Sequence, residues 1–296
     1  MPQPPPKRKL ALLVNPAAAG GKAMKAVAPV KEALDALHAE YRVIETSSGE
    51  HAKNEAKGAA NNGEAVVSIG GDGMVGTLAG AILDTGAELA IIPAGRGNDF
   101  ARVLEIPTDP KEAATLAATG ESKTLDVGEV DGKSFVGIAS CGFDSDANRI
   151  ANEAKLIRGN LVYAYAAIKA LAQWKPARFD VTVDGNTHTI TGYSAGVANS
   201  KAYGGGMYAA PHAVLDDGQL DIVLCAHVPK RRFLFRIMPK VFKGKHLEEP
   251  NMSVFKGQSV HVSADRPFVM YADGDPLANL PCTVTVRPKA LRVITP

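Results

Sequence analysis

Apolar residues in the first 120 positions fall into short runs that alternate with longer stretches of helical spacing. The short runs are rich in small and β-branched residues and predict buried strands, at 9–14, 41–44, 65–69 and 89–92. The longer stretches place apolar residues on one side of a helix and predict helices, at 25–38, 51–61, 75–83 and 111–119. Because strands that alternate with helices form parallel sheets with crossover helices, this part of the chain is predicted to be an α/β domain.

The pattern changes near residue 122. Beyond it, strand-like segments follow one another through tight turns, at 123–130, 133–139, 178–183, 188–198, 219–226, 259–264 and 283–288. Helical patterns interrupt these segments near 147–173 and 230–242. This succession is typical of an antiparallel domain. We therefore expect an α/β domain over residues 1–122 and a β-domain over 123–288, with a last strand at 290–294 through which residues 289–296 rejoin the first domain.

Composition excludes several classes of protein but does not identify a function. The chain has 296 residues, of which 46% are hydrophobic and 22% charged, as in an ordinary globular protein. Its net charge of +2 gives no sign of a polyanionic partner. Three cysteines lie far apart with no CxxC pair, which favours a reducing compartment over a disulfide frame or a zinc site. With no leader-like segment and no membrane-length apolar run, the sequence predicts a cytoplasmic protein.

Small and polar residues follow four predicted strands of the first domain. The four segments read NPAAAGGK from Asn15, ETSSG from Glu45, GGDG from Gly70 and AGRGND from Ala94. In parallel sheets, ligands bind outside the carboxyl ends of the strands, where these segments would meet. A strand, a glycine turn and a helix also direct backbone N–H groups at a phosphate. The acid within the turn, Asp72, would repel a phosphate unless a cation lay between them, so we predict nucleotide phosphates bound with Mg²⁺.

Two other interpretations of the glycine turn fit less well. Residues 71–76 satisfy the GxGxxG dinucleotide pattern, but the next strand does not end in the acid that would hold a ribose. No GxxxxGK[ST] segment is present, so a P-loop is not predicted. A plain connection between a strand and a helix remains a third alternative.

Taken together in chain order, the motifs resemble the diacylglycerol kinase catalytic domain family, in its bacterial lipid kinase branch. The N-terminal NP…G, the GGDG turn and the AGRGNDFAR segment carry the resemblance in the first domain. In the second domain it continues through YGGGM at 203–207, LDDGQLD at 215–221 and ADGD at 272–275. The resemblance implies a three-layer α/β nucleotide-binding domain of the NAD kinase and diacylglycerol kinase type, followed by an antiparallel β-sandwich. It also implies ATP in the cleft between the two domains and a lipid hydroxyl as the phosphoryl acceptor.

The resemblance further implies a set of site residues. Those expected to line the nucleotide are Asn15, Pro16, Thr46, Gly70, Gly71, Asp72, Gly73, Met74, Gly76, Thr77, Gly95, Arg96, Asn98 and Asp99. Asp72 would be central to Mg-ATP, and Asp275, with Asp273 beside it, would hold the catalytic base position. A structural Mg²⁺ would bind the Asp217 carboxylate and the backbone carbonyls of Val214 and Gln219. Each acid also has a simpler interpretation, because Asp-Gly-Asp-Pro is good turn chemistry, acid-rich loops are commonly solvated, and Asp99 could cap a helix.

This sequence departs from the family pattern at particular positions. The family's usual sequence at this turn is GGDGTxNE. In this chain the five residues after the acid are Gly73-Met74-Val75-Gly76-Thr77. Met74 therefore stands in place of a hydroxyl residue, Gly76 in place of an amide and Thr77 in place of a carboxylate. Arg96 stands where the family has threonine, and we interpret it as a positive charge directed toward the phosphates. Asp275 is one methylene shorter than the family's glutamate. These changes leave room for lower activity or for a different lipid.

The segment 227–246 is locally basic, and its cations interleave with apolar residues at helical spacing. Arg232, Arg236, Lys240 and Lys243 would share one face, and Pro239 should kink the helix. A basic amphipathic helix suits an anionic membrane surface, whereas a helix packed on the sandwich with a solvated basic rim is an equal alternative. Nothing else in the sequence supports a nucleic-acid partner. The oligomeric state stays open, and a homodimer is one alternative.

We therefore expect an ATP- and Mg²⁺-dependent lipid kinase at the cytosolic membrane face, with diacylglycerol as the acceptor and phosphatidic acid as the product. Phosphoryl transfer needs positioning, charge neutralisation and a base, and glycine amides, Mg²⁺ and a carboxylate supply all three. Two alternatives remain: an NAD kinase-like enzyme, and a catalytically weak lipid-binding or regulatory protein.

Overall fold

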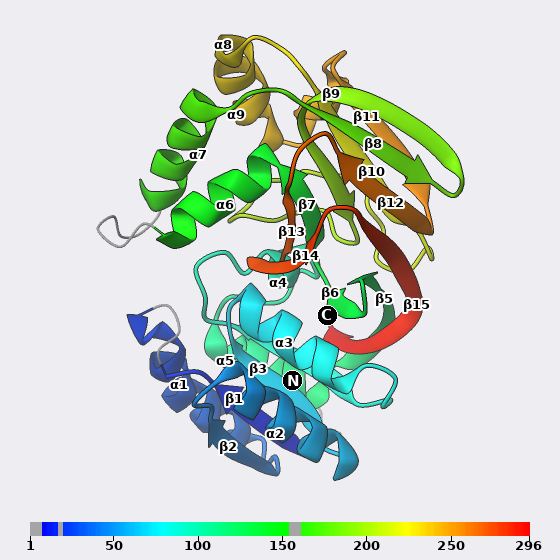
Figure 1. Cartoon of the computed structure of the whole chain (residues 1–296). Helices are drawn as coiled ribbons and strands as arrows, with labels where there is room; N and C mark the ends of the chain where they lie inside the picture. The colour runs from blue at the N-terminus through cyan, green and yellow to red at the C-terminus, as the bar shows by residue number, and fades with distance from the viewer. Residues whose placement is uncertain (1–7, 17–19, 154–160) are drawn as a thin grey trace. The chain divides into compact units, whose positions relative to one another are not determined.

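The computed structural model describes residues 8–16, 20–153 and 161–296. Contacts divide the chain into two compact units, residues 1–127 with 287–296 as unit 1, and residues 128–286 as unit 2 (Figure 1). The boundary expected near residue 122 lies at the start of strand β5 (Glu121–Val130), which continues to the first residues of unit 2. Each unit is described by itself below.

Unit 1 is built on a parallel sheet of four strands in the order β2-β1-β3-β4. The strands are β1 (Leu10–Val14), β2 (Tyr41–Glu45), β3 (Ala65–Gly70) and β4 (Glu88–Pro93). The end of β15 (Cys282–Thr295) adds a fifth parallel strand, because Arg292 and Val293 pair with Glu88 and Leu89. Strands β1 and β3 are buried along their whole length, as expected for the continuous apolar runs of a sheet covered on both faces.

Helices cover this sheet in two layers, in which α1 packs with α5 and α2 with α3 (Figure 1). Their bounds are α1 (Lys22–Ala36), α2 (Gly49–Asn61), α3 (Asp72–Ile82), α4 (Asp99–Val103) and α5 (Pro110–Thr119). Ser48 and Asp109 cap α2 and α5 by accepting backbone N–H groups of the first turn. Buried alanines face the sheet in α2 and α5, so these helices lie close to it. The three-layer α/β domain predicted from the sequence is confirmed.

Unit 2 is an antiparallel β-sandwich, as predicted. Its strands are β6 (Lys133–Phe135), β7 (Ile138–Gly142), β8 (Ala177–Val183), β9 (Asn186–Ala198), β10 (Leu220–Ala226), β11 (Met252–Gly257), β12 (Ser259–Ala264), β13 (Val269–Ala272) and β14 (Asp275–Asn279), with the start of β15. The order runs β14-β13-β7-β9-β8-β12-β15, while β10 pairs with both β9 and β11. The core is rich in aromatic rings, and Phe135, Phe179 and Tyr193 are fully buried in it.

Some elements of unit 2 differ from the prediction. The strand expected over 133–139 is two strands, β6 and β7, and the two strands expected at 283–288 and 290–294 are the single β15. Strands β11, β13 and β14 were not predicted, since they are short or half exposed and lack a strong apolar run. The helical pattern over 147–173 corresponds to α6 (Phe143–Glu153) and α7 (Leu161–Gln173), and residues 154–160 lie outside the described residues.

The basic helix predicted over 230–242 is not a continuous α-helix. It consists of α8 (Lys230–Arg232), a π-helical turn (Phe233–Ile237) and α9 (Met238–Val241), and a 3₁₀ turn follows at Lys245–Glu248. Pro239 has no N–H group to donate to the carbonyl four residues earlier. The wider π-helical turn before it accommodates this missing hydrogen bond. Within the described residues, no helix combines the length and apolar character needed to cross a lipid bilayer.

Candidate functional site

The two glycine-rich segments of unit 1 meet at the carboxyl edge of the parallel sheet. Gly70 and Pro93 are register partners at the ends of β3 and β4, and the Ala94 N–H group donates to the Gly70 carbonyl at 2.8 Å. Directly beyond them, a Cβ atom added to Gly95 would lie 2.3 Å from the Gly71 Cα atom. Only glycine therefore fits at position 95, and two stretches of bare backbone lie together where the sequence predicted a phosphate cradle.

Asp72 links these two segments. Gly71 is the N-cap of α3 and Asp72 is its first residue, so the helix begins within the predicted turn. The Asp72 Oδ1 atom accepts the Phe100 N–H group at 3.0 Å, which ties the start of α3 to the start of α4. Burial raises the pKa of Asp72, and backbone N–H groups of Phe100, Asp99 and Asp72 partly offset that rise. The carboxylate predicted to serve Mg-ATP thus also has a positioning role inside unit 1.

The AGRGND segment has its own hydrogen-bonded geometry. Asn98 adopts a left-handed conformation (φ 51°) and its Oδ1 atom accepts the Gly95 N–H group at 2.8 Å, which closes a tight turn. Asp99 is buried in the first turn of α4 and pairs with Arg102, whose guanidinium also donates to the Gly97 carbonyl at 2.9 Å. Arg96 is exposed on the loop. Asn98 and Asp99 therefore shape the loop, whereas Arg96 is the side chain that remains available to a ligand.

Among the other predicted nucleotide residues, two hydroxyl groups bind backbone carbonyls. Thr46 is buried, and both its N–H group and its hydroxyl donate to the Val14 carbonyl, at 2.8 and 3.2 Å. The Thr77 hydroxyl is likewise engaged, because it donates to the Gly73 carbonyl at 2.8 Å. Asn15 is exposed at the end of β1, and the half-buried residues Pro16, Met74 and Gly76 offer no polar side chain. Residues 17–19 of the NPAAAGGK segment lie outside the described residues.

In unit 2, the two predicted catalytic acids occupy a β-hairpin formed by β13 and β14. Its two turn residues, Asp273 (φ 51°) and Gly274 (φ 94°), are both left-handed, and Ala272 pairs with Asp275 across the turn. The Asp273 carboxylate accepts the N–H groups of Val136 and Gly137, at 2.9 and 3.0 Å. Asp275 is exposed at the first position of β14. One acid thus holds the hairpin in place, and the other faces solvent.

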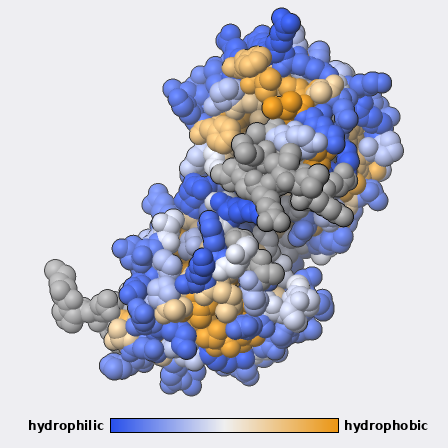
Figure 2. All heavy atoms as spheres, turned by 90° about the vertical axis from the view of Figure 1, so that its left-hand side faces the viewer, coloured by the Kyte–Doolittle hydropathy of each residue, from blue (hydrophilic) through white to orange (hydrophobic). Residues whose placement is uncertain are grey.

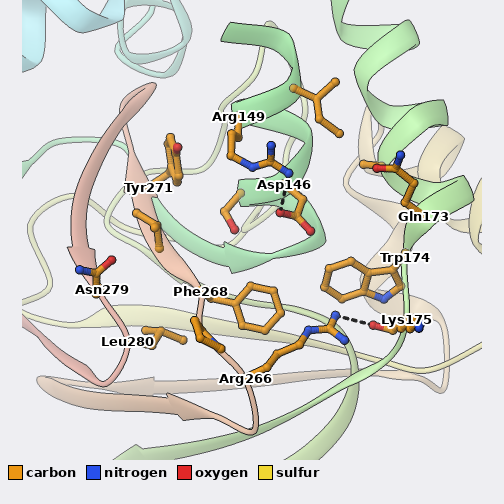
Figure 3. A pocket seen from close by; sticks show the side chains of 15 residues that line it. Asp146, Arg149, Gln173, Trp174, Lys175, Arg266, Phe268, Tyr271, Asn279 and Leu280 are labelled. Atoms are coloured by element: carbon orange, nitrogen blue, oxygen red, sulfur yellow. Dashed lines mark hydrogen bonds and ion pairs between the residues drawn. The ribbon is translucent and has the colours of Figure 1, made fainter. Parts of the chain in front are cut away.

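The same hairpin forms part of a pocket in unit 2 with a volume of about 410 Å³. Figure 3 shows side chains from α6, from the end of α7 and from the segment before β13 converging on it. Its polar and aromatic lining includes Asp146, Arg149, Trp174, Lys175, Arg266, Phe268, Tyr271 and Asn279. No pattern in the sequence indicates this pocket, because its walls come from segments far apart in the chain.

Comparison with known proteins gives the family. A family model described as the diacylglycerol kinase catalytic domain matches residues 9–130, and one described as the YegS C-terminal NAD kinase beta sandwich-like domain matches residues 137–295. The diacylglycerol kinase of Mycobacterium tuberculosis is 35% identical over 298 residues, covering 97% of this chain and 95% of the relative. The chain belongs to the diacylglycerol kinase family.

Two further relatives agree with this. The diacylglycerol kinase of Bacillus subtilis is 25% identical over 90% of each chain. A crystal structure of a diacylglycerol kinase from Bacillus anthracis has a TM-score of 0.75 at 23% identity, covering 98% of this chain and 97% of that one, and shows the same fold. Membership of the diacylglycerol kinase family makes the chain a kinase that uses ATP. The resemblance expected from the sequence is confirmed.

The structural Mg²⁺ site that the family resemblance implied is already in contact with a cation of the protein. The Gln219 N–H group donates to Asp217 Oδ1 at 3.0 Å, and the Lys256 ammonium lies 2.7 Å from Asp217 Oδ2. The same ammonium lies 3.3 Å from the buried carboxylate of Asp221, its register partner across β10 and β11. A divalent ion and an ammonium would compete for the Asp217 oxygen, so this arrangement does not fit Mg²⁺ unless Lys256 moves away. The metal site at Val214, Asp217 and Gln219 stays a prediction.

Sequence reasoning missed another acid of the kinase, Asp144, in the first turn of α6. Burial raises the pKa of Asp144 to about 6, although hydrogen bonds from Ser194 and from Tyr203 of the YGGGM motif favour its charged form. A carboxylate that titrates near neutral pH is a candidate functional group. The sequence signal was weak, since an acid after a buried strand is also an ordinary helix start.

The basic face predicted for residues 230–242 is largely occupied. Arg232, Arg236 and Lys240 all reach Glu249, whose side chain is 1% exposed. Hydrogen bonds from Lys240, Arg236 and Arg232 lower the pKa of Glu249 to about 2. These cations are therefore engaged with unit 2 itself, although the Arg236 side chain is still 61% exposed, and Phe235 and Phe242 on the same segment are 75% and 53% exposed. Figure 2 looks onto the side of unit 2 that bears this segment and shows apolar and hydrophilic residues next to one another there.

Proposed function

We propose that this chain transfers the γ-phosphoryl group of ATP to the free hydroxyl of diacylglycerol, giving phosphatidic acid and ADP. The observation that supports it most strongly is the contact of Gly71 with Gly95, with Asp72 tying the two segments together at the carboxyl edge of the sheet. Bare backbone at a strand end and a helix N-terminus suit the phosphates of a nucleotide. The named diacylglycerol kinases that match the chain over nearly its full length support the choice of acceptor.

Asp72 and its surroundings fit Mg-ATP. Gly73 has open space beside it, with no atom within 4 Å of where a Cβ atom would lie, and Asp72 is a half-buried carboxylate held in place by the Phe100 N–H group. Mg²⁺ bound there would neutralise phosphate charge that the carboxylate alone would repel. Arg96, exposed on the same loop, would add positive charge in place of the neutral hydroxyl that the family pattern has at this position.

Asp275 is the residue we assign as the base. Its carboxylate would take the proton of the lipid hydroxyl while the hydroxyl oxygen forms a bond to the γ-phosphorus and the bond from phosphorus to the bridging oxygen of ADP breaks. The turn that presents Asp275 is held by Asp273, which accepts two N–H groups and is therefore poorly suited to accept a proton itself. We thus assign Asp273 a positioning role.

We also propose that the segment 231–243 touches an anionic membrane surface. Its outward side chains include Phe235 and Phe242 with Arg231 and Lys243, a combination of aromatic rings and cations that suits the headgroup region. The three cations bound to Glu249 would chiefly anchor the segment to unit 2, although the Arg236 side chain is 61% exposed.

Labelled ATP tests the proposed function directly. The purified chain is incubated with [γ-³²P]ATP, Mg²⁺ and, in separate reactions, diacylglycerol, monoacylglycerol, a sphingoid base, a prenol and NAD, with the Asp72→Asn variant as the inactive control. We expect label in phosphatidic acid from diacylglycerol and none above the control elsewhere. Label in NADP would favour the NAD kinase alternative, and no labelled acceptor at all would favour the catalytically weak lipid-binding alternative.

A further inference from the structure

The pocket of unit 2 contains a buried hydrogen-bond donor without an acceptor. Trp174, the only tryptophan of the sequence, lines the pocket and is 4% exposed. Its indole Nε1–H group is buried and has no hydrogen-bond acceptor in the part of the chain that the structure describes. Leaving a buried donor unpaired is costly, so this wall of the pocket is incompletely satisfied. Because the N–H group itself is shielded from solvent, the polar contacts of a ligand would fall to the charged side chains of the lining.

Cations outnumber acids around the same pocket. Among the lining residues that the structure describes, Arg149, Lys175 and Arg266 are cations and Asp146 is the one acid, and Arg149 pairs with Asp146 at 3.4 Å. Arg266 is fixed in place, because its guanidinium stacks over Trp174 and Phe268, 5.1 and 5.0 Å from the ring centroids, and donates to the Lys175 carbonyl at 2.6 Å. Figure 3 shows Arg149 and Arg266 on opposite sides of the two rings. The polar side of the pocket is thus a donor set with a net positive charge.

The rest of the lining is apolar. Buried side chains of Ile150, Ala170 and Phe268 form the interior together with Trp174, and Leu280 completes it. A volume of about 410 Å³ lies in the range of small-molecule sites. Because Arg266 already covers the faces of Trp174 and Phe268, a flat base has little ring surface left to stack on. A flexible acyl chain, in contrast, can pack against ring edges and aliphatic side chains.

We propose that this pocket binds an anionic acyl lipid, with its phosphate oxygens at the arginine and lysine side chains and its first acyl carbons on the apolar floor. The choice of a phosphate-bearing lipid rests on the proposed function, whose product is phosphatidate. Tyr271 and Asn279 of the β13–β14 hairpin line the pocket, and that hairpin also carries Asp275. A phosphorylated lipid held here therefore lies against the element that presents the proposed base, where it would compete with a new acceptor.

Trp174 itself reports the binding. Brominated acyl chains quench indole fluorescence at short range, and no other tryptophan contributes to the signal. The full chain is titrated without nucleotide in detergent micelles that contain brominated phosphatidate, brominated phosphatidylglycerol or brominated diacylglycerol at equal bromine content. We expect quenching by phosphatidate at about one tenth of the concentration that diacylglycerol needs, as for a ligand held by charge-assisted hydrogen bonds.

Each brominated lipid in the titration tests a different part of the proposal. Quenching by phosphatidate alone identifies the reaction product as the ligand, and equal quenching by phosphatidylglycerol identifies anionic lipids in general. Equal or stronger quenching by diacylglycerol overturns the preference for an anionic lipid, and quenching no greater than that by brominated detergent overturns the site. Kinase turnover measured separately keeps the two proposals apart, because turnover without quenching refutes only the pocket and quenching without turnover refutes only the proposed function.

Matched charge variants locate the effect. Arg149→Gln and Lys175→Gln should each raise the phosphatidate concentration needed for half-maximal quenching about fivefold or more. Lys169→Gln removes the same charge from the exposed face of α7, where Lys169 stacks on Tyr165 outside the pocket, and should change nothing. Circular dichroism checks that each variant is folded. Unchanged titrations for both pocket variants, or an equal effect of Lys169→Gln, would refute the assignment.

Discussion

The Asp273 carboxylate accepts the Gly137 N–H group at 3.0 Å, and Gly137 has no room for a side chain there. A Cβ atom on Gly137 would lie 2.3 Å from Asp273 Oδ1. The second oxygen of Asp273 accepts the neighbouring Val136 N–H group at 2.9 Å. This clamp fixes the turn of the β13–β14 hairpin to the connection between β6 and β7, so the exposed Asp275 is presented from a rigid support.

Asp275 should therefore govern turnover without governing stability. Asp275→Asn removes the proposed base and should lower kcat by about 10²–10⁴-fold, with the KM for ATP and the melting temperature nearly unchanged. Asp275→Glu restores the residue type of the family and should retain activity. Steady-state kinetics with diacylglycerol and a thermal melt measure both effects.

Asp273→Asn is the matched comparison for Asp275→Asn. Its amide nitrogen cannot accept an N–H group, so one of the two bonds to residues 136 and 137 is lost and the free energy of unfolding should fall by about 1–3 kcal/mol. Normal turnover of Asp275→Asn would show that Asp275 is not the base. Loss of turnover by Asp273→Asn with unchanged stability would assign the role of base to Asp273.

The sequence predicted those parts of the site that depend on strand ends. Strand order in a parallel α/β domain places the ends of neighbouring strands together, which is why the GGDG and AGRGND segments could be expected to meet. Their direct contact at Gly71 and Gly95, and the bond from Asp72 to Phe100, depend on loop conformations that a periodic pattern does not encode.

Pairings between distant residues could not be predicted. Glu249 lies 9 to 17 positions beyond the cations that it binds. The spacing within the basic segment therefore indicated an open basic face, because it carries no information about this distant acid. Lys256 meets Asp217 only because β11 pairs with β10. The pocket around Trp174 likewise combines residues from α6, from the end of α7 and from residues 266–280, and its lining residues themselves follow no recognisable motif.

Lys256 should stabilise the protein by pairing with the carboxylates of Asp217 and Asp221. Burial raises the pKa of Asp221, and Lys256 partly offsets this, so Lys256→Met should raise the pKa of Asp221 further. A carboxyl group with a raised pKa costs stability as the pH rises through that value. The variant should thus be less stable than the parent by about 1–2 kcal/mol at pH 7.5, a modest figure because Lys256 is 38% exposed, and equally stable near pH 4.

Magnesium completes the Lys256 test. With the ammonium gone, millimolar Mg²⁺ should recover part of the lost stability in urea unfolding, whereas the parent protein should not respond. Stabilisation of the parent by Mg²⁺, and its loss with a chelator or in Asp217→Asn, would show that the metal displaces Lys256 and that the site predicted from the sequence forms.

Asp144 should make the stability of the protein depend on pH. Because burial raises its pKa to about 6, the folded protein holds the Asp144 proton more tightly than the unfolded chain, and stability falls as the pH rises from about 4 to above 6. Asp144→Asn keeps an acceptor for Ser194 and Tyr203 without the charge. Its free energy of unfolding should exceed that of the parent by about 3 kcal/mol at pH 8 and match it near pH 4. A difference that is the same at both pH values would argue against the raised pKa.

Phe235 and Phe242 should determine membrane binding more than the cations bound to Glu249. Each ring is exposed, and burying such a side chain in a lipid interface contributes about 1.5–3 kcal/mol. The double variant Phe235→Ser with Phe242→Ser should therefore bind vesicles rich in phosphatidylglycerol at least tenfold more weakly in a flotation assay. Val43→Ser, which removes a partly exposed apolar residue (37% exposed) from β2 of unit 1, is the control and should bind normally.

Charge variants on segment 231–243 distinguish cations that contact the membrane from cations that stabilise the fold. Arg231→Gln with Lys243→Gln should weaken binding to anionic vesicles and reduce its salt dependence, because these cations face outward. Arg236→Gln should instead lower the melting temperature, because it leaves the buried Glu249 carboxylate short of a partner. If the phenylalanine variant bound vesicles as well as the Val43→Ser control, segment 231–243 would be a surface feature of the sandwich and not a membrane contact.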